Sequence, residues 1–257
     1  MAIPRVIPVL LLKNTGLVKT VQFKDPKYLG DPLNAVKIFN EKEVDELIFL
    51  DILATSEKKS IPFEFLKEVA EECFMPLAYG GGIKTLEDIR AILKIGIEKV
   101  IINSQLYKDL DFVKEAVNQF GSSTIAVSLD VKKNFWGKYE LFSEGGRTNT
   151  KKDPIEFAKE LDNIGVGEIM INSIDRDGTM KGYDLDLITK MCAAVQVPVI
   201  ACGGAATIDD FDKAINQAGA SAVAAGSMFV FHGKHRAVLI SYPEQADLKR
   251  IFSKKTQ

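Results

Sequence analysis

The segment PLAYGGGIKTLEDI, residues 76–89, recurs later in the chain as PVIACGGAATIDDF, residues 198–211. Each copy starts as a short apolar run, passes through consecutive glycines and continues with apolar residues at helical spacing. A strand that ends at glycine and leads into a helix is the βα unit of a parallel sheet. The two copies therefore indicate a chain assembled from repeated βα units.

Neighbouring segments repeat in the same order and at nearly the same spacing. The corresponding pairs are RVIPVLLLKN (5–14) with TIAVSLDVKK (124–133), ELIFLDILATS (46–56) with EIMINSIDRDG (168–178), and KVIINSQLY (99–107) with AVAAGSMFV (222–230). Consecutive units thus recur together, and Leu11 falls at the position of Asp130. We expect one domain over residues 1–257 that consists of two similar half-barrels, about 1–122 and 123–257.

Eight near-continuous apolar runs alternate with amphipathic segments. The runs cover residues 6–12, 46–52, 75–79, 99–103, 124–131, 168–172, 197–201 and 222–226. Strands of this kind are buried on both faces, as in a parallel sheet covered by helices. They predict an α/β fold of the (β/α)8 TIM-barrel type, with a doubly wound open sheet as the alternative. A single insertion, residues 131–146, is expected to form two antiparallel arms around the turn NFWG.

The composition is that of an ordinary globular protein. The net charge of −2 and the hydrophobic fraction of 46% give no indication of a nucleic-acid or membrane partner. Cys73, Cys192 and Cys202 lack metal-type spacing and indicate reduced thiols, so we expect a soluble, cytoplasmic protein. His232 and His235 have no third ligand near them in the sequence, and we expect neither a metal nor a cofactor.

Glycines and small polar residues lie at the expected carboxyl ends of four strands, where such barrels carry their active sites. Backbone N–H groups at these glycines can approach an anion closely, and the hydroxyl groups and helix N-termini that follow complete a phosphate cradle. Two equivalent cradles predict an elongated substrate with a phosphate at each end, although either glycine pair alone could be a tight turn. The cradle residues are Gly81, Gly82, Asn103 and Ser104 in the first half and Gly203, Gly204, Gly226 and Ser227 in the second.

Carboxylates at strand ends are candidates for acid–base chemistry. Asp130 ends an apolar strand, where a carboxylate must be paired, hydrogen-bonded or shifted in pKa, and this suits a general acid or base. Asp51 ends the second strand and could equally hold loop backbone. In the loop IDRDGTMKGYD (174–184), Asp175 or Asp177 could bind a sugar hydroxyl or could cap the turn.

Several of these segments together resemble the cyclase subunit of imidazole glycerol phosphate synthase. They are DELIFLDILATSE, YGGGIKTLED, KVIINS, GEIMINSIDRDGTMKGYD and PVIACGGAA, and the resemblance extends over nearly the whole chain. It implies a class I glutaminase subunit docked at the N-terminal face of the barrel, whose ammonia passes through the interior to a substrate at the C-terminal face.

The family's charged entry ring matches four residues at the beginnings of strands, the bottom of the barrel. Because unpaired charges are costly to bury, we expect a closed ring of ion pairs, which could act as an ammonia gate or as a stabilising polar plug. The four residues are Arg5, Glu46, Lys99 and Glu168.

The chain departs from the family pattern at the expected site. The family uses two aspartates, at the ends of strands one and five, for ring closure; the second matches Asp130, but the first falls on Leu11. Threonines expected on strands three and six fall on Ala78 and Asn172, whereas the lysine of the first loop matches Lys19. Leu11 cannot transfer a proton, and loss of one member of an acid–base pair commonly lowers a rate about 10²–10⁴-fold.

Leu11 and the divergent tail, residues 231–252, favour a paralogue that retains ammonia delivery but serves another amidation. The resemblance implies such a role beside surface-polysaccharide genes, where cyclase-like subunits supply ammonia for acetamidino groups on sugars. The second hypothesis is a genuine cyclase of histidine biosynthesis in which another group replaces the missing carboxylate. The third is a non-catalytic scaffold that activates a glutaminase, which the retained Asp130 and Lys19 disfavour.

Overall fold

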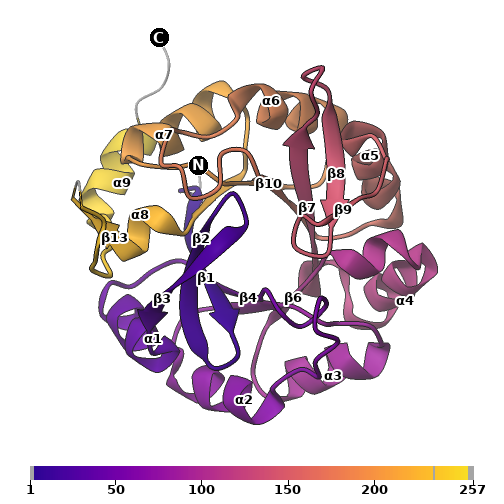
Figure 1. Ribbon diagram of the computed structural model, residues 1–257, viewed down its shortest axis with the longest axis horizontal. Helices are drawn as coiled ribbons and strands as arrows, with labels where there is room; N and C mark the ends of the chain where they lie inside the picture. The colour runs from indigo at the N-terminus through magenta and orange to yellow at the C-terminus, as the bar shows by residue number, and fades with distance from the viewer. Residues whose placement is uncertain (1–2, 234, 254–257) are drawn as a thin grey trace.

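The computed structural model describes residues 3–233 and 235–253, and its centre is a closed parallel β-barrel (Figure 1). Its strands are β1 (Arg5–Lys13), β4 (Leu47–Asp51), β5 (Leu77–Gly80), β6 (Lys99–Ile102), β7 (Ile125–Lys133), β10 (Glu168–Ser173), β11 (Val199–Cys202) and β12 (Ala222–Ala225). Each pairs in parallel with its neighbours, and the pairing of β12 with β1 closes the barrel. The predicted TIM-barrel fold is confirmed, and the open sheet is excluded because the first and last strands are paired.

Helices surround the barrel (Figure 1). They are α1 (Pro32–Glu41), α2 (Phe63–Glu72), α3 (Leu86–Lys94), α4 (Leu110–Phe120), α5 (Pro154–Ile164), α6 (Leu185–Ala194), α7 (Ile208–Asp212) with the π-helical segment η3 (Lys213–Gln217), α8 (Ser227–Val230) and α9 (Gln245–Phe252), besides the 3-10 turns η1 (Ser104–Tyr107) and η2 (Ser122–Thr124). Local sequence explains their ends: at α5, Asp153 caps the first turn beside Pro154, and Gly165 adopts the left-handed conformation that terminates the helix.

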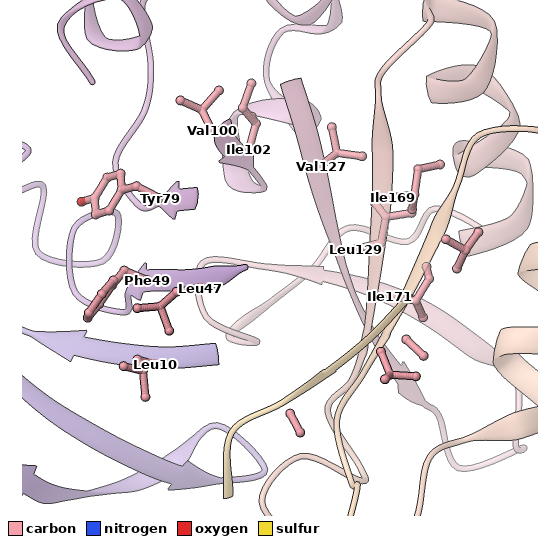
Figure 2. Packing of buried hydrophobic residues seen from close by; sticks show 14 of the residues in the cluster. Leu10, Leu47, Phe49, Tyr79, Val100, Ile102, Val127, Leu129, Ile169 and Ile171 are labelled. Carbon is pink, nitrogen blue, oxygen red and sulfur yellow. The ribbon is translucent and has the colours of Figure 1, made fainter. Parts of the chain in front are cut away.

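The barrel strands alternate between an outer and an inner core. On β7, Val127 and Leu129 pack outward against the helices, whereas Ala126 packs inside the barrel. Figure 2 shows members of the outer set. The inner set is made of Ile7, Val9, Ile48, Ala78, Ile101, Ala126, Met170, Ile200, Cys202, Ala222 and Ala224. Because side chains alternate along each strand, Asp130 faces inward at the mouth, four residues beyond Ala126.

The predicted antiparallel insertion is present, but it is accompanied by another hairpin. Strand β8 (Tyr139–Ser143) pairs with β7 and with the short β9 (Thr148–Asn149). The expectation of a single antiparallel insertion is wrong, because β2 (Gly16–Val21) pairs antiparallel with β1 and with β3 (Lys24–Gly30). The turn of this second hairpin places Gln22 and Phe23 at positive φ, without the Asn-Gly or Asp-Gly dipeptide that usually marks such a turn.

The last βα unit is interrupted. After β12, the single-turn helix α8 leads into a short antiparallel pair, β13 (Phe231–His232) with β14 (Ala237–Val238), before α9 completes the ring of helices. His232 and His235 are both exposed in this segment. Among residues 3–233 and 235–253, no helix combines the length and hydrophobicity needed to cross a membrane.

Candidate functional site

A cavity of about 400 Å³ opens at the carboxyl ends of the barrel strands. It extends from Val9 and Ile101 in the barrel interior to Lys19 on β2 and Arg147 in the turn between β8 and β9. All eight predicted cradle residues line it, although they are far apart in the sequence: Gly81, Gly82, Asn103, Ser104, Gly203, Gly204, Gly226 and Ser227. Asp51, Asp130 and Asp177 line the same cavity, so both halves of the sequence contribute to a single site.

The first cradle depends on glycine at a close backbone approach. Gly81 has a φ of 140°, and a Cβ atom there would lie 2.7 Å from Cβ of Asp51. Ser104 begins η1 on the adjacent unit, and its hydroxyl oxygen accepts a hydrogen bond from the backbone N–H of Glu144 at 3.2 Å. Asn103 turns its amide toward Asp130. In this arrangement backbone N–H groups and the start of η1 remain to bind an anion.

The second cradle contains a buried hydroxyl without a partner. Ser227, the first residue of α8, is buried, and its Oγ has no hydrogen-bond partner among the described residues. A Cβ atom at Gly226 would lie 3.0 Å from Cε of Lys19, so the lysine stem packs directly against this cradle. An unpartnered hydroxyl beside an ammonium group suits an oxygen-rich anionic ligand.

Lys19 is paired across the mouth of the cavity. Its Nζ lies 2.9 Å and 3.1 Å from the two carboxylate oxygens of Asp177, which also accepts a hydrogen bond from the hydroxyl group of Thr20. All three side chains are buried. The sequence left open whether Asp177 binds a sugar hydroxyl or caps the turn, and in the structure its carboxylate contacts Lys19 and Thr20.

Asp130 combines burial with hydrogen bonds from two neighbours. Asn103 donates from Nδ2 to Oδ2 of Asp130 at 3.1 Å, and Ser128 Oγ lies 3.5 Å from Oδ1. Burial, followed by the charge of Asp177, raises the pKa of Asp130 to about 7, although both hydrogen bonds act in the opposite direction. A carboxyl group with a pKa near neutrality can both give and take a proton in the same pH range.

Leu11 occupies the equivalent position on the opposite side of the mouth. It is paired in register with Leu50, and both side chains line the cavity and pack against the inner core. Asp130 is instead paired in register with Asn172, whose Oδ1 is buried without a partner in the described part of the chain. Leu11 and Leu50 thus form an apolar patch on β1 and β4, although Lys13 and Asp51 at the ends of these strands also line the cavity. On β7 and β10 the corresponding positions are polar.

The other two carboxylates hold backbone. Asp51 Oδ1 accepts hydrogen bonds from the backbone N–H groups of Leu53 and Ala54 at 2.8 Å and 3.1 Å, and burial raises its pKa. Asp175 accepts a hydrogen bond from the backbone N–H of Lys133 at 2.8 Å. For Asp51 this is the structural alternative that the sequence left open, whereas Asp175 binds the end of β7 rather than capping its own loop.

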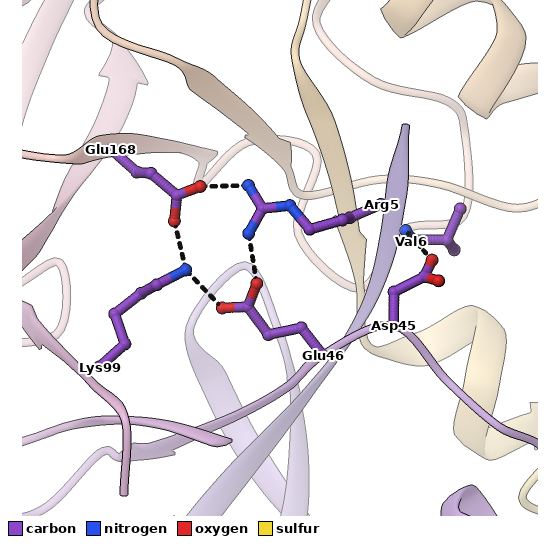
Figure 3. Close-up of polar contacts among 6 residues, drawn as sticks. All are labelled: Arg5, Val6, Asp45, Glu46, Lys99 and Glu168. Carbon is purple, nitrogen blue, oxygen red and sulfur yellow. Dashed lines mark hydrogen bonds and ion pairs between the residues drawn. The ribbon is translucent and has the colours of Figure 1, made fainter. Parts of the chain in front are cut away.

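The four charged residues predicted at the bottom of the barrel close into a ring (Figure 3). Arg5 contacts both Glu46 and Glu168, and Lys99 Nζ lies 2.9 Å from Glu46 and 2.6 Å from Glu168. Both glutamates are buried. Each charge therefore has two partners of opposite sign, which is the arrangement that makes burial of four charges tolerable.

Sequence reasoning missed several residues of the site. Ser128 precedes Asp130 by two positions, and strand alternation alone would have placed it on the same inward face. Lys13, Thr20 and Arg147 also line the cavity, but they lie in segments whose fold over the mouth had no local signal.

Replacing Asp130 by asparagine should flatten the dependence of stability on pH. The folded pKa of about 7 lies above the value of about 3.9 for an unfolded aspartate, so the protonated carboxyl stabilises the fold fully below about pH 4. This contribution is lost as the pH rises through 7, at up to about 1.4 kcal/mol per pH unit. Urea unfolding at pH 5 and pH 8 measures the effect: Asp130→Asn should gain stability relative to the wild type at pH 8, and an equal pH response in both proteins would contradict it.

Comparison with known proteins agrees with the geometry. Residues 5–236 match the family described as histidine biosynthesis protein. A Pseudomonas aeruginosa protein named "Putative imidazole glycerol phosphate synthase subunit hisF2" is 56% identical over 240 residues, which cover 93% of this chain and 96% of that protein. A Vibrio vulnificus protein named "Putative imidazole glycerol phosphate synthase subunit hisF3" is 49% identical over 247 residues, 96% of this chain and 95% of its own length. The Alkaliphilus metalliredigens "Imidazole glycerol phosphate synthase subunit HisF" is 40% identical over 228 residues, 89% and 90% of the two chains.

Proposed function

The chain belongs to the histidine biosynthesis protein family, as a relative of the HisF subunit of imidazole glycerol phosphate synthase, and we propose that it delivers ammonia without closing an imidazole ring. The observation that carries the proposal is Leu11, whose side chain lines the cavity where the family pattern expects the first of its two aspartates. Ring closure by an acid–base pair needs proton transfer on both sides of the substrate, and the wall formed by β1 and β4 has no group for it at this position.

Three features support the proposed delivery of ammonia. The ring of Arg5, Glu46, Lys99 and Glu168 stands at the end of the barrel opposite the cavity, where ammonia would enter. Between the ring and the cavity, alanines occupy inner positions on β5, β7 and β12, and their small side chains support a path for ammonia. Asp130 remains as one proton-transferring group at the end of this path.

A glutaminase at the N-terminal face would supply the ammonia, and a phosphorylated small molecule would occupy the mouth. The two cradles support an anionic group at each end of that molecule. We propose that the delivered ammonia is used in surface-polysaccharide synthesis, to form acetamidino groups on sugars. A genuine cyclase of histidine biosynthesis is the second candidate, because Asp130 and Lys19 keep the family residues and one relative is named as the synthase subunit.

The deciding assay supplies the cyclase substrate, N′-phosphoribulosyl-formimino carboxamide ribotide, with ammonium chloride, so that no glutaminase is required. We expect the wild type to form the imidazole product at least about 10²-fold more slowly than the Alkaliphilus HisF subunit measured in parallel. Leu11→Asp then tests whether the missing carboxylate is the cause, since it should raise the rate. A wild-type rate equal to that of the control would show that the chain is a cyclase.

A further inference from the structure

The turn between β7 and β8 exposes two large aromatic side chains side by side. Phe135 is 93% exposed and Trp136, the single tryptophan of the chain, is 86% exposed. Their rings meet edge to face, with centroids 5.5 Å apart and an angle of 85° between the planes. Adjacent aromatic residues that bury almost nothing in the folded chain are typical of the centre of a protein interface.

This turn is rigid. Asn134 Oδ1 accepts hydrogen bonds from the backbone N–H groups of Trp136 and Lys138 at 2.9 Å and 3.0 Å, and the backbone N–H of Asn134 donates to the carbonyl oxygen of Lys138 at 2.9 Å. Gly137, at a φ of 76°, completes the tight turn. The backbone that carries the aromatic pair is therefore held by hydrogen bonds before any partner arrives, which lowers the entropy lost on binding.

Lysine residues lie close to the aromatic pair in the sequence. Lys132, Lys133 and Lys138 flank the turn, and within the hairpin Glu140 accepts hydrogen bonds from the side-chain amides of Asn134 and Asn149. Asp184 and Asp186 also approach the hairpin and accept hydrogen bonds from the hydroxyl group of Tyr139. These lysines favour a partner with an acidic surface around an apolar pocket.

The ammonium groups do not project with the aromatic rings. Lys132 lies over the ring of Phe142 at 5.9 Å, and Lys133 lies over the ring of Tyr139 at 4.7 Å and 3.7 Å from Asp184. Phe142 pairs with Asp130 at the base of the hairpin, so this charge lies along its flank, toward the cavity. A surface that wraps the flank and receives the aromatic pair in a pocket fits this arrangement better than a flat lipid surface.

The hairpin also connects the turn to the site. Strand β7 carries Asp130 and continues past the mouth to the turn, which stands at the edge of the molecule in Figure 1. Five residues from Asp130 to Phe135 span at most about 17 Å of extended chain. A protein held at the turn could therefore cover the cavity at the same time.

We propose that Phe135 and Trp136 anchor the protein that receives the ammonia, through an apolar pocket with an acidic rim. This inference rests on the proposed function, because delivered ammonia is protonated in bulk water at neutral pH and must pass directly to the protein that uses it. Docking at this turn would place that protein over the mouth, at the end of the barrel opposite the charged ring.

The experiment introduces the photo-crosslinking residue p-benzoylphenylalanine at position 135 of the full chain, in the cells that produce it. We expect it to capture an amidating enzyme, which in purified form should shift the emission of Trp136 to shorter wavelength. Phe135→Ser should weaken binding of that purified enzyme about thirtyfold, as truncation of an interface hot spot does. Phe74→Ser is the matched control, because Phe74 is 85% exposed and precedes β5 at the opposite end of the barrel, so it should leave binding unchanged.

Other outcomes overturn the inference. One is that the crosslinker captures the glutaminase or a second copy of this chain. Another is that the two serine variants weaken binding equally. A third is that phosphatidylglycerol vesicles shift the emission of Trp136 while the purified enzyme does not. If glutamine-dependent amidation is unchanged in Phe135→Ser, the turn is not the docking site, and the proposed ammonia delivery is unaffected. Ring closure by the wild type would instead remove the proposed function itself.

Discussion

Replacing Lys99 by methionine should lower the free energy of unfolding by about 3–5 kcal/mol, the cost of leaving a buried charge uncompensated. Lys99 bridges Glu46 and Glu168, whose side chains are only 4% and 12% exposed. Without the ammonium group, two carboxylates share Arg5 alone, and the ring carries a net negative charge in a poorly solvated position. Urea unfolding at neutral pH measures the difference.

Two further variants make this result interpretable. Lys94→Met removes an exposed lysine from the last turn of α3 and should change stability by less than about 0.5 kcal/mol. Adding Glu168→Gln to Lys99→Met restores neutrality and should recover part of the loss, which a double-mutant cycle quantifies. A loss below about 1 kcal/mol for Lys99→Met would mean that solvent, rather than the ring, compensates these carboxylates.

Asp130→Asn should reduce glutamine-dependent amidation about 10²–10⁴-fold, the effect of removing a general acid or base. The asparagine side chain keeps the shape of the aspartate, and Asn103 and Ser128 remain beside it. It lacks the carboxyl group, with a pKa near neutrality, that would transfer the proton. The measurement is the fraction of surface-polysaccharide sugar that carries the acetamidino group, after the variant replaces the wild-type gene in the cell.

The pH prediction for the same variant provides its control. Because Asp130→Asn is expected to be at least as stable as the wild type at pH 8, lost amidation would not reflect unfolding. Binding of the glutaminase at the opposite end of the barrel should also be unchanged. Unchanged amidation would instead support the scaffold hypothesis, in which the chain activates its partner without taking part in chemistry.

The two halves of the chain contribute unequally to the cavity. Leu11 and Leu50 give the first half an apolar patch, whereas Asp130, Asn172 and Ser128 make the facing part of the second half polar. A substrate held between the cradles would then meet a proton-transferring group on the side of Asp130 and an apolar surface on the side of Leu11. This asymmetry is the physical basis of the proposed role.

Regular periodicity made most of the fold predictable. Eight apolar runs, each followed by a helical pattern, predicted the barrel. Together with the long internal repeat, they predicted that the cradle glycines lie at strand ends. The hairpin of β2 and β3 was missed because its turn, at Gln22 and Phe23, lacks the usual residues. Packing against the loop that carries Asp177 supports this hairpin, including a hydrogen bond from the backbone N–H of Gln22 to the carbonyl oxygen of Asp177.

The sequence alone placed the cradle glycines, Leu11 and Asp130 at strand ends, since strand register and the internal repeat are properties of the chain order. It therefore established that Leu11 stands where its counterpart is Asp130. The resemblance to the family supplied the expectation of the bottom ring. Only the tertiary structure decided what those residues do. Lys19 and Asp177 meet across 158 positions of sequence, and Asn103 reaches Asp130 from the residue that follows β6. Ion pairs and pKa shifts depend on the distances between charged groups and on the removal of those groups from water. Both are set only when the barrel has closed.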